Sequence, residues 1–187
     1  MKYENIYNLR WKESVKKKDD SILKFTNFTN HAEFFYYYYN NFIHNKIDQK
    51  KQDLSILEIG CGRGTASLYL KILNKNIESH LLDFSKNAIQ IAKKNFNKYD
   101  LDASFYTSSF NNFSIETKFD YIISLGVLEH IENINSEITQ MKKFLKKNGK
   151  MIHLIVPEKK NSIQKYFNFV NRSFNFIFKN TNKEWLD

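Results

Sequence analysis

Three glycines at alternate positions, Gly60, Gly62 and Gly64, mark the stretch of the chain best suited to ligand binding. They follow an apolar run, Leu54 to Ile59, and precede an apolar segment, Thr65 to Leu73. We therefore predict a buried strand, a glycine turn and a helix. Glycine accepts positive φ and lets a ligand approach the backbone, and the helix start offers unpaired N–H groups to an anion. A tight strand-to-helix connection that binds nothing would show the same pattern.

Two carboxylates accompany this turn. Glu58 lies just before the first glycine, and Asp83 stands near the end of a second predicted strand, Ile77 to Phe84. One β-α-β step separates them, so both are expected at the same edge of a parallel sheet. An acid at the tip of the second strand can accept hydrogen bonds from both hydroxyls of a ribose. Alternatively, Asp83 only stabilises the start of the next helix, which Ser85 is expected to cap.

The order E-x-G-x-G-x-G from Glu58 to Gly64 resembles motif I of class I S-adenosylmethionine-dependent methyltransferases. It differs from the dinucleotide fingerprint G-x-G-x-x-G, whose third glycine comes one residue later. The resemblance implies that the loop backbone holds the methionine end of the cofactor and that Glu58 organises the loop around its ammonium group. The loop residues concerned are Gly60, Cys61, Gly62 and Gly64.

A second match is the run FDYIISLGVLEHI, residues 119–131, which resembles the fourth-strand motif of the small-molecule branch of these enzymes. The resemblance implies that the backbone at the strand tip contacts the methionine moiety. The tip residues are Leu125, Gly126 and Val127. With both motifs in order, it also implies that Asp83 binds the ribose and that Phe84 borders the adenine.

The chain departs from the family after the third predicted strand, Asp102 to Tyr106. Many members place an acid there to meet the adenine amino group, whereas this chain has Ser108, Ser109 and Phe110. Ser109 stands nearest to the usual acid, and its hydroxyl is a weaker acceptor than a carboxylate. We expect these three residues around the adenine.

His130 is the best-placed candidate for a general base, four residues beyond Gly126. A base is needed only if the acceptor group carries a proton. The alternative for His130 is a structural role at a helix start, and His153, inside a strand, is expected to be structural. Some relatives bind a divalent metal through E-x-x-E-H at this turn, but Gly126 replaces the first acid here, so we predict no metal site.

Several classes of methyltransferase are excluded by what is absent. Enzymes that methylate the amino groups of adenine or cytosine carry a proline-proline-aromatic motif after the fourth strand, and the single proline of this chain is Pro157. Cytosine ring methylation needs a nucleophilic cysteine after that strand, and the single cysteine, Cys61, lies in the glycine loop.

The composition predicts a protein of the cytoplasm. The 187 residues, 42% of them hydrophobic, suffice for a single core, and one cysteine cannot form an internal disulfide. We find neither a signal-peptide pattern nor an apolar run that could span a membrane, so no stable membrane insertion is expected. The net charge of +9 comes from scattered lysines, with only three arginines. We therefore expect solvated faces rather than a nucleic-acid partner.

The alternation of predicted strands and helices predicts the fold class α/β, and the resemblance implies a three-layer Rossmann-like α/β/α sandwich with a mostly parallel sheet in strand order 3-2-1-4-5. We divide the chain into an N-terminal helical cap (1–50), a cofactor-binding core (51–158) and an aromatic-rich C-terminal helix (159–187). The fourth and fifth strands are predicted at 119–125 and 151–156. Between them we predict a helix that carries a stripe from Ile134 to Leu145 and stops at Asn148-Gly149.

The tail after Phe178 is too short and polar for the C-terminal β-hairpin that the resemblance implies, so we expect either a trimmed domain or an incomplete reading frame. An uncovered fifth strand or the C-terminal helix would invite homo-oligomer formation. In the N-terminal cap, six consecutive aromatics, residues 34–39, favour packing of a helix on the sheet over a substrate lid or a shallow membrane contact.

The sequence thus predicts a methyltransferase that uses S-adenosylmethionine to methylate a small molecule, such as a metabolite, lipid or sugar. One alternative is a cofactor-binding or degenerate domain without turnover. A second alternative, an NAD-dependent oxidoreductase, is disfavoured by the glycine spacing and by the fourth-strand motif.

Overall fold

The computed structural model describes residues 9, 11–13, 23–29 and 31–155. Residues 9 and 11–13 are helical, as predicted for this part of the chain. The predictions for the aromatic-rich C-terminal helix and for the segment 159–187 lie outside the described residues.

Within the described part of the chain, strands and helices alternate. The strands are β1 (Ser55–Ile59), β2 (Glu78–Asp83), β3 (Ser104–Thr107), β4 (Phe119–Leu125) and β5 (Leu145–Leu154). The α-helices are α2 (His31–His44), α3 (Thr65–Leu73), α4 (Lys86–Lys98) and α5 (Ile134–Lys142), and two short 3₁₀ turns are η1 (Phe110–Asn112) and η2 (Leu128–His130). The strands form one parallel sheet in the order β3-β2-β1-β4-β5, which confirms the predicted topology.

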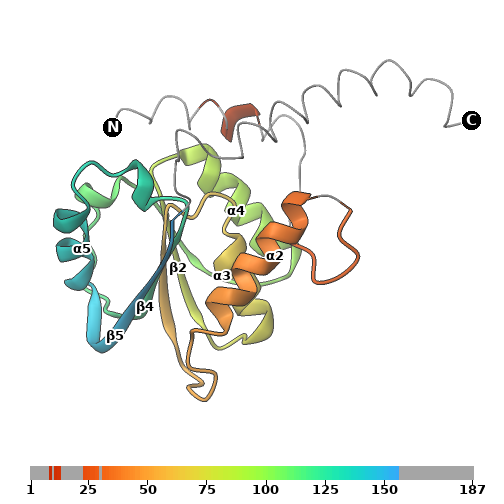
Figure 1. Cartoon of the computed structure of the whole chain (residues 1–187), viewed down its shortest axis with the longest axis horizontal. Coiled ribbons are helices and arrows are strands. Elements are labelled where there is room, and N and C mark those ends of the chain that lie inside the picture. Colours follow the sequence, from red (N-terminus) through yellow and green to blue (C-terminus); the bar gives the residue numbers. More distant parts are fainter. Residues whose placement is uncertain (1–8, 10, 14–22, 30, 156–187) are drawn as a thin grey trace, which may run out of the picture. The chain divides into compact units, whose positions relative to one another are not determined.

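Helices cover both faces of the sheet, so that the domain has three layers. Figure 1 shows α2, α3 and α4 on one face and α5 on the other. The central strand β1 is buried along its whole length, as expected for a parallel sheet covered on both sides. One apolar cluster joins β1 to α2 and α3 through Ile43, Ile56 and Leu70, and a second joins the other face to α5 through Met141.

The start of α4 follows its sequence signal. Ser85 caps the helix as predicted, its side-chain oxygen accepting from the backbone N–H of Ala88 at 3.5 Å. Such a cap fixes the position at which the chain leaves β2, and therefore the position of Asp83.

The predicted helix stop at Asn148-Gly149 is wrong. Helix α5 ends at Lys142, and β5 begins at Leu145, opposite Phe119 of β4. The pairing then shifts, because Lys150 lies opposite Tyr121 and the intervening residues bulge. Gly149 lies in this bulge, where an added Cβ would stand 2.8 Å from the carbonyl oxygen of Phe119. The glycine thus permits a close approach between strands and does not cap a helix.

The aromatic run on α2 divides between packing and exposure. Ile43 is buried in the core, and Tyr37 packs against the cluster that joins α3 and α4. Large side chains on the opposite side of the helix remain exposed: Phe34, Phe35, Tyr38 and Phe42. The predicted packing on the domain is therefore confirmed for one side of α2. Among the described residues, no helix has the length and apolar character needed to cross a membrane.

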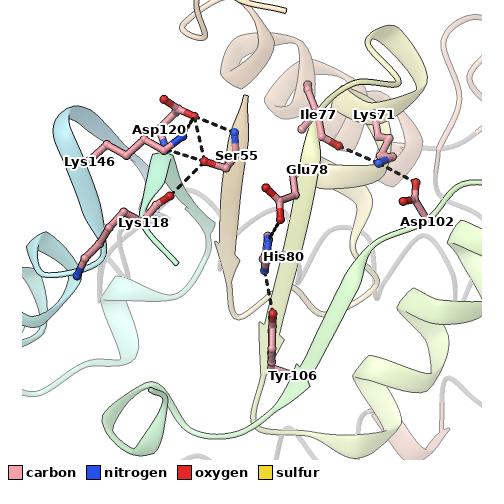
Figure 2. Close-up of polar contacts among 10 residues, drawn as sticks. All are labelled: Ser55, Lys71, Ile77, Glu78, His80, Asp102, Tyr106, Lys118, Asp120 and Lys146. Atoms are coloured by element: carbon pink, nitrogen blue, oxygen red, sulfur yellow. Dashed lines mark hydrogen bonds and ion pairs between the residues drawn. The ribbon is translucent and has the colours of Figure 1, made fainter. Parts of the chain in front are cut away.

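Near the amino ends of the strands, three buried residues, Ser55, His80 and Asp120, have polar partners (Figure 2). Asp120 of β4 accepts from the Ser55 backbone N–H and hydroxyl, both at 2.9 Å, and pairs with Lys146 at 2.8 Å and with Lys51. His80 of β2 is held between Glu78 and Tyr106, with 2.9 Å to each. These contacts link neighbouring strands.

Candidate functional site

The glycine turn has the backbone geometry that only glycine adopts easily. Gly60, Gly62 and Gly64 have φ of 64°, 52° and 69°. A Cβ added to Gly60 would stand 2.5 Å from Cγ2 of Val127, which follows β4. The loop after β1 and the loop after β4 therefore meet closely, as the two sequence motifs require.

Glu58 supports this turn from behind. Its carboxylate is 4% exposed and accepts from the backbone N–H of Ser67, in the first turn of α3, at 3.0 Å. The N-cap of α3 is Gly64, which has no side chain, so Glu58 supplies the missing acceptor. Burial raises the pKa of Glu58 to about 7, against the lowering effect of the bond from Ser67.

Asp83 is fixed by the backbone on two sides. One oxygen accepts from the N–H of Gly62 at 2.9 Å and the other from the N–H of Ser85 at 2.8 Å. The residue is 5% exposed, and burial raises its pKa although both backbone bonds lower it. Each carboxylate oxygen has a second lone pair, so the bond to the helix start and a bond to a ligand are compatible.

A cavity of about 440 Å³ opens at the carboxyl ends of β1, β2 and β4. Ten of the residues proposed from sequence line it. They are Gly60, Asp83, Phe84, Ser108, Ser109, Phe110, Leu125, Gly126, Val127 and His130. The other four, Glu58, Cys61, Gly62 and Gly64, form the turn and its support without lining the cavity. A cavity at this edge of a parallel sheet is the expected place for a ligand.

Trp11, which the motifs did not single out, forms part of the cavity wall. A Cβ on Gly62 would meet its indole ring at 2.8 Å, and the Arg63 guanidinium lies 6.0 Å from the ring centroid. The helical repeat of apolar residues in the N-terminal segment includes Trp11, but no local signal shows which element it covers.

The far end of the cavity lies between η1 and α5, and sequence reasoning missed all of it. The additional lining residues are Asn111, Ile131, Glu132, Asn133, Glu137 and Met141. One signal was available for Glu137. It stands four residues before Met141 in the apolar stripe of α5 and therefore shares its inner face.

The two histidines of interest occupy different surroundings. His130 is half-buried in the cavity wall, and its backbone N–H donates to the Val127 carbonyl at 3.0 Å. His153 of β5 lies 2.8 Å from the Ser124 hydroxyl, between its Nδ1 and the Oγ, and burial lowers its pKa. Among the described residues, no three His, Cys, Asp or Glu side chains are grouped as metal ligands.

Comparison with curated proteins gives relatives that are named as methyltransferases. The chain is 32% identical over 104 residues to the ubiquinone biosynthesis O-methyltransferase of Pelagibacter ubique, covering 56% of this chain and 42% of that protein. It is 29% identical over 111 residues to the enzyme of the same name from Rickettsia typhi, covering 58% and 44%. The chain thus spans less than half the length of these relatives.

Solved structures share the fold. The plantazolicin methyltransferase BpumL, in complex with SAH, is 26% identical with a TM-score of 0.52, over 61% of this chain and 44% of that chain. A methyltransferase-like protein from Methanococcus maripaludis gives a TM-score of 0.57 at 24% identity, over 77% and 72%.

The family model described as "Methyltransferase domain" matches residues 50–183, which is well over half of the chain. Together with the sheet order, the glycine turn and the cavity at the strand tips, this match establishes the family. The chain belongs to the class I S-adenosylmethionine-dependent methyltransferases.

Proposed function

We propose that this chain transfers the methyl group of S-adenosylmethionine to a small-molecule acceptor. The observation that carries the proposal is the cavity in which Gly60 of the glycine turn and a buried carboxylate, Asp83, meet at the strand tips. The complex of BpumL with SAH and the named O-methyltransferases among the relatives support it.

The residues fit the cofactor part by part. The backbone of the glycine turn would hold the methionine end, and Asp83 would accept from the ribose hydroxyls. Phe84 and the residues after β3 would border the adenine. The cofactor supplies a methyl group already activated on a sulfonium, so the protein has to align the acceptor and exclude water.

His130 is our candidate for the base that takes the proton of a hydroxyl acceptor. It lies in the cavity wall next to the tip of β4, where the resemblance puts the methionine moiety. The acceptor itself is proposed only as a small molecule, with no metal and no nucleic acid involved. A location in the cytoplasm and self-association through β5 or the C-terminal segment stay predictions.

Isothermal titration with S-adenosylmethionine, SAH and NAD tests the cofactor. We expect binding of the first two and none of NAD. The Asp83→Ala variant should lose about tenfold or more in affinity, the weight of hydrogen bonds to a charged group. Because Asp83 also accepts hydrogen bonds from Gly62 and Ser85, the Asp83→Asn variant and an unfolding measurement check that the fold is intact. Asp53→Ala is the matched control, because Asp53 is exposed.

Turnover on a panel of hydroxyl, amine and carbon acceptors tests the enzyme. Methylated product confirms the transfer, and binding of SAH without product from any acceptor favours the degenerate alternative. Unchanged SAH affinity in a folded Asp83→Ala variant would count against the site.

A further inference from the structure

The end of the cavity between η1 and α5 carries a pair of polar side chains for which the sequence motifs assign no role. Glu137 of α5 and Asn111 of η1 both border the cavity. With its amide nitrogen turned toward Glu137, Asn111 donates to the two carboxylate oxygens at 2.6 and 3.2 Å. Glu137 is half-buried, and burial raises its pKa although the bond from Asn111 opposes the shift.

Large apolar side chains line the cavity together with this pair. Phe84 and Phe110 lie in the same cavity wall, and Met141, fully buried, stands one turn from Glu137 on α5. A hydrogen-bond donor stabilises a half-buried carboxylate, because removing a polar group from water without a partner costs free energy. Asn111 supplies one donor group, and each carboxylate oxygen can accept a further hydrogen bond.

A purine has the complementary chemical character. Its two faces are apolar, and the edge of adenine carries an amino group that donates hydrogen bonds. The backbone N–H of Ser108 donates to the Asp83 carbonyl at 3.0 Å, so the segment after β3 starts directly beside the proposed ribose site. Phe110, Asn111 and Glu137 line the same cavity as Asp83, so we infer that a base attached to that ribose would lie toward them.

We propose that Glu137, positioned by Asn111, accepts a hydrogen bond from the adenine amino group of the cofactor. This inference rests on the proposed function. A carboxylate from α5 would then act where the segment after β3 offers only Ser108 and Ser109. The contact between Glu137 of α5 and Asn111 of η1 shows that α5 lies beside this segment. Glu137 would thereby set the preference for adenine.

The test compares SAH with its analogue that carries hydrogen in place of the adenine amino group, both measured by titration calorimetry. For the unmodified chain we expect SAH to bind about tenfold or more tightly, as for a hydrogen bond to a charged acceptor. Glu137→Leu should weaken SAH and leave the analogue nearly unchanged, so that the ratio of the two dissociation constants falls to within about twofold of one.

Glu116→Leu is the matched control, because Glu116 is an exposed carboxylate that does not line the cavity. Its ratio should equal that of the unmodified chain. Asn111→Ala provides a second variant, with an expected partial loss of the ratio because Glu137 is no longer held in place.

The outcomes separate this inference from the proposed function. If the unmodified chain binds no SAH, both fail. If SAH binds and Glu137→Leu keeps the full preference over the analogue, the adenine contact is overturned and the proposed function stands. A Glu137→Leu effect on the KM of an acceptor, with the preference intact, would likewise overturn it and place the carboxylate at the acceptor.

Discussion

At the scale of single residues, the site depends on carboxylates that the fold takes out of water. Glu58 and Asp83 are both almost fully buried, and both accept from backbone N–H groups near the glycine turn. These bonds position the turn before any ligand arrives. The cost of the burial is that the charged form of each carboxylate is disfavoured.

Glu58 should make the stability of the ligand-free protein depend on pH. Its pKa is about 7 in the fold and near 4.5 in the unfolded chain. Because the folded value is the higher one, its stabilising contribution is complete below pH 4.5 and is lost as the pH rises toward 7. The loss is about 3 kcal/mol at 1.36 kcal/mol per pH unit.

The measurement compares the unmodified chain with Glu58→Gln by urea unfolding between pH 5 and 8. Glutamine can still accept from Ser67 and does not titrate, so its stability relative to the unmodified chain should rise with pH. The lowered pKa of His153 acts in the opposite direction but is common to both proteins. A difference between the two proteins that does not change with pH would contradict the prediction.

At the scale of elements, two glycines of the site, Gly64 and Gly126, have different structural roles. Gly64 and Gly126 have almost the same φ, 69° and 67°. A Cβ on Gly64 would meet Leu81 at 2.6 Å and Ala92 at 3.2 Å, whereas on Gly126 the nearest atom is a Glu129 oxygen at 3.5 Å. Gly64 therefore joins α3, α4 and β2 by close packing, and Gly126 needs only its backbone conformation.

Both alanine variants should be destabilised by the left-handed conformation, by about 1–2 kcal/mol. Gly64→Ala should lose a further 1–3 kcal/mol or so, because the added methyl overpacks a buried contact. Chemical denaturation of the pair measures the difference directly, with each variant serving as the other's control. Equal losses would mean that α3 and α4 can move apart freely.

The sequence predicted elements well where a local pattern matched the tertiary environment. β4 and α3 have the predicted bounds, and β1 and β2 differ by a residue or so at their ends, because buried apolar runs between turn residues leave few alternatives. Asn148-Gly149 misled because an Asn-Gly pair signals a helix stop and a strand bulge equally well. The close approach of Gly149 to Phe119 arises from the pairing of β5 with β4, which no local sequence pattern shows.

The same distinction applies to the candidate site. The glycine turn and Asp83 could be located because each belongs to a motif with fixed spacing. Trp11, Asn111 and Glu137 could not, because they come from three separate elements and only the packed domain brings them to one cavity. Of these, only Glu137 had a local signal, a carboxylate on the apolar side of its helix.

At the scale of the whole domain, the sheet separates binding from support. The cavity lies at the carboxyl ends of the strands, and the network around Asp120 lies near their amino ends (Figure 2). This network joins β1, β4 and β5 through Ser55 and Lys146. Burial alone would raise the pKa of Asp120, but the bonds from Lys146, Lys51 and Ser55 together hold it well below its ordinary value.

Replacing Asp120 should therefore lower stability without affecting the site. Asp120→Asn leaves Lys51 and Lys146 without their carboxylate, and because both lysines are about half exposed, the loss should be about 1–3 kcal/mol rather than the larger value of a fully buried pair. The lowered pKa means that the contribution is present above pH 4 and disappears in acid, so the loss should shrink as the pH approaches 3. Urea unfolding at pH 3 to 7 measures the loss of stability. Titration with SAH should give an affinity within about twofold of that of the unmodified chain, because no hydrogen bond at the strand tips is removed. A large loss of SAH affinity in a folded Asp120→Asn variant would show that the two ends of the sheet are coupled.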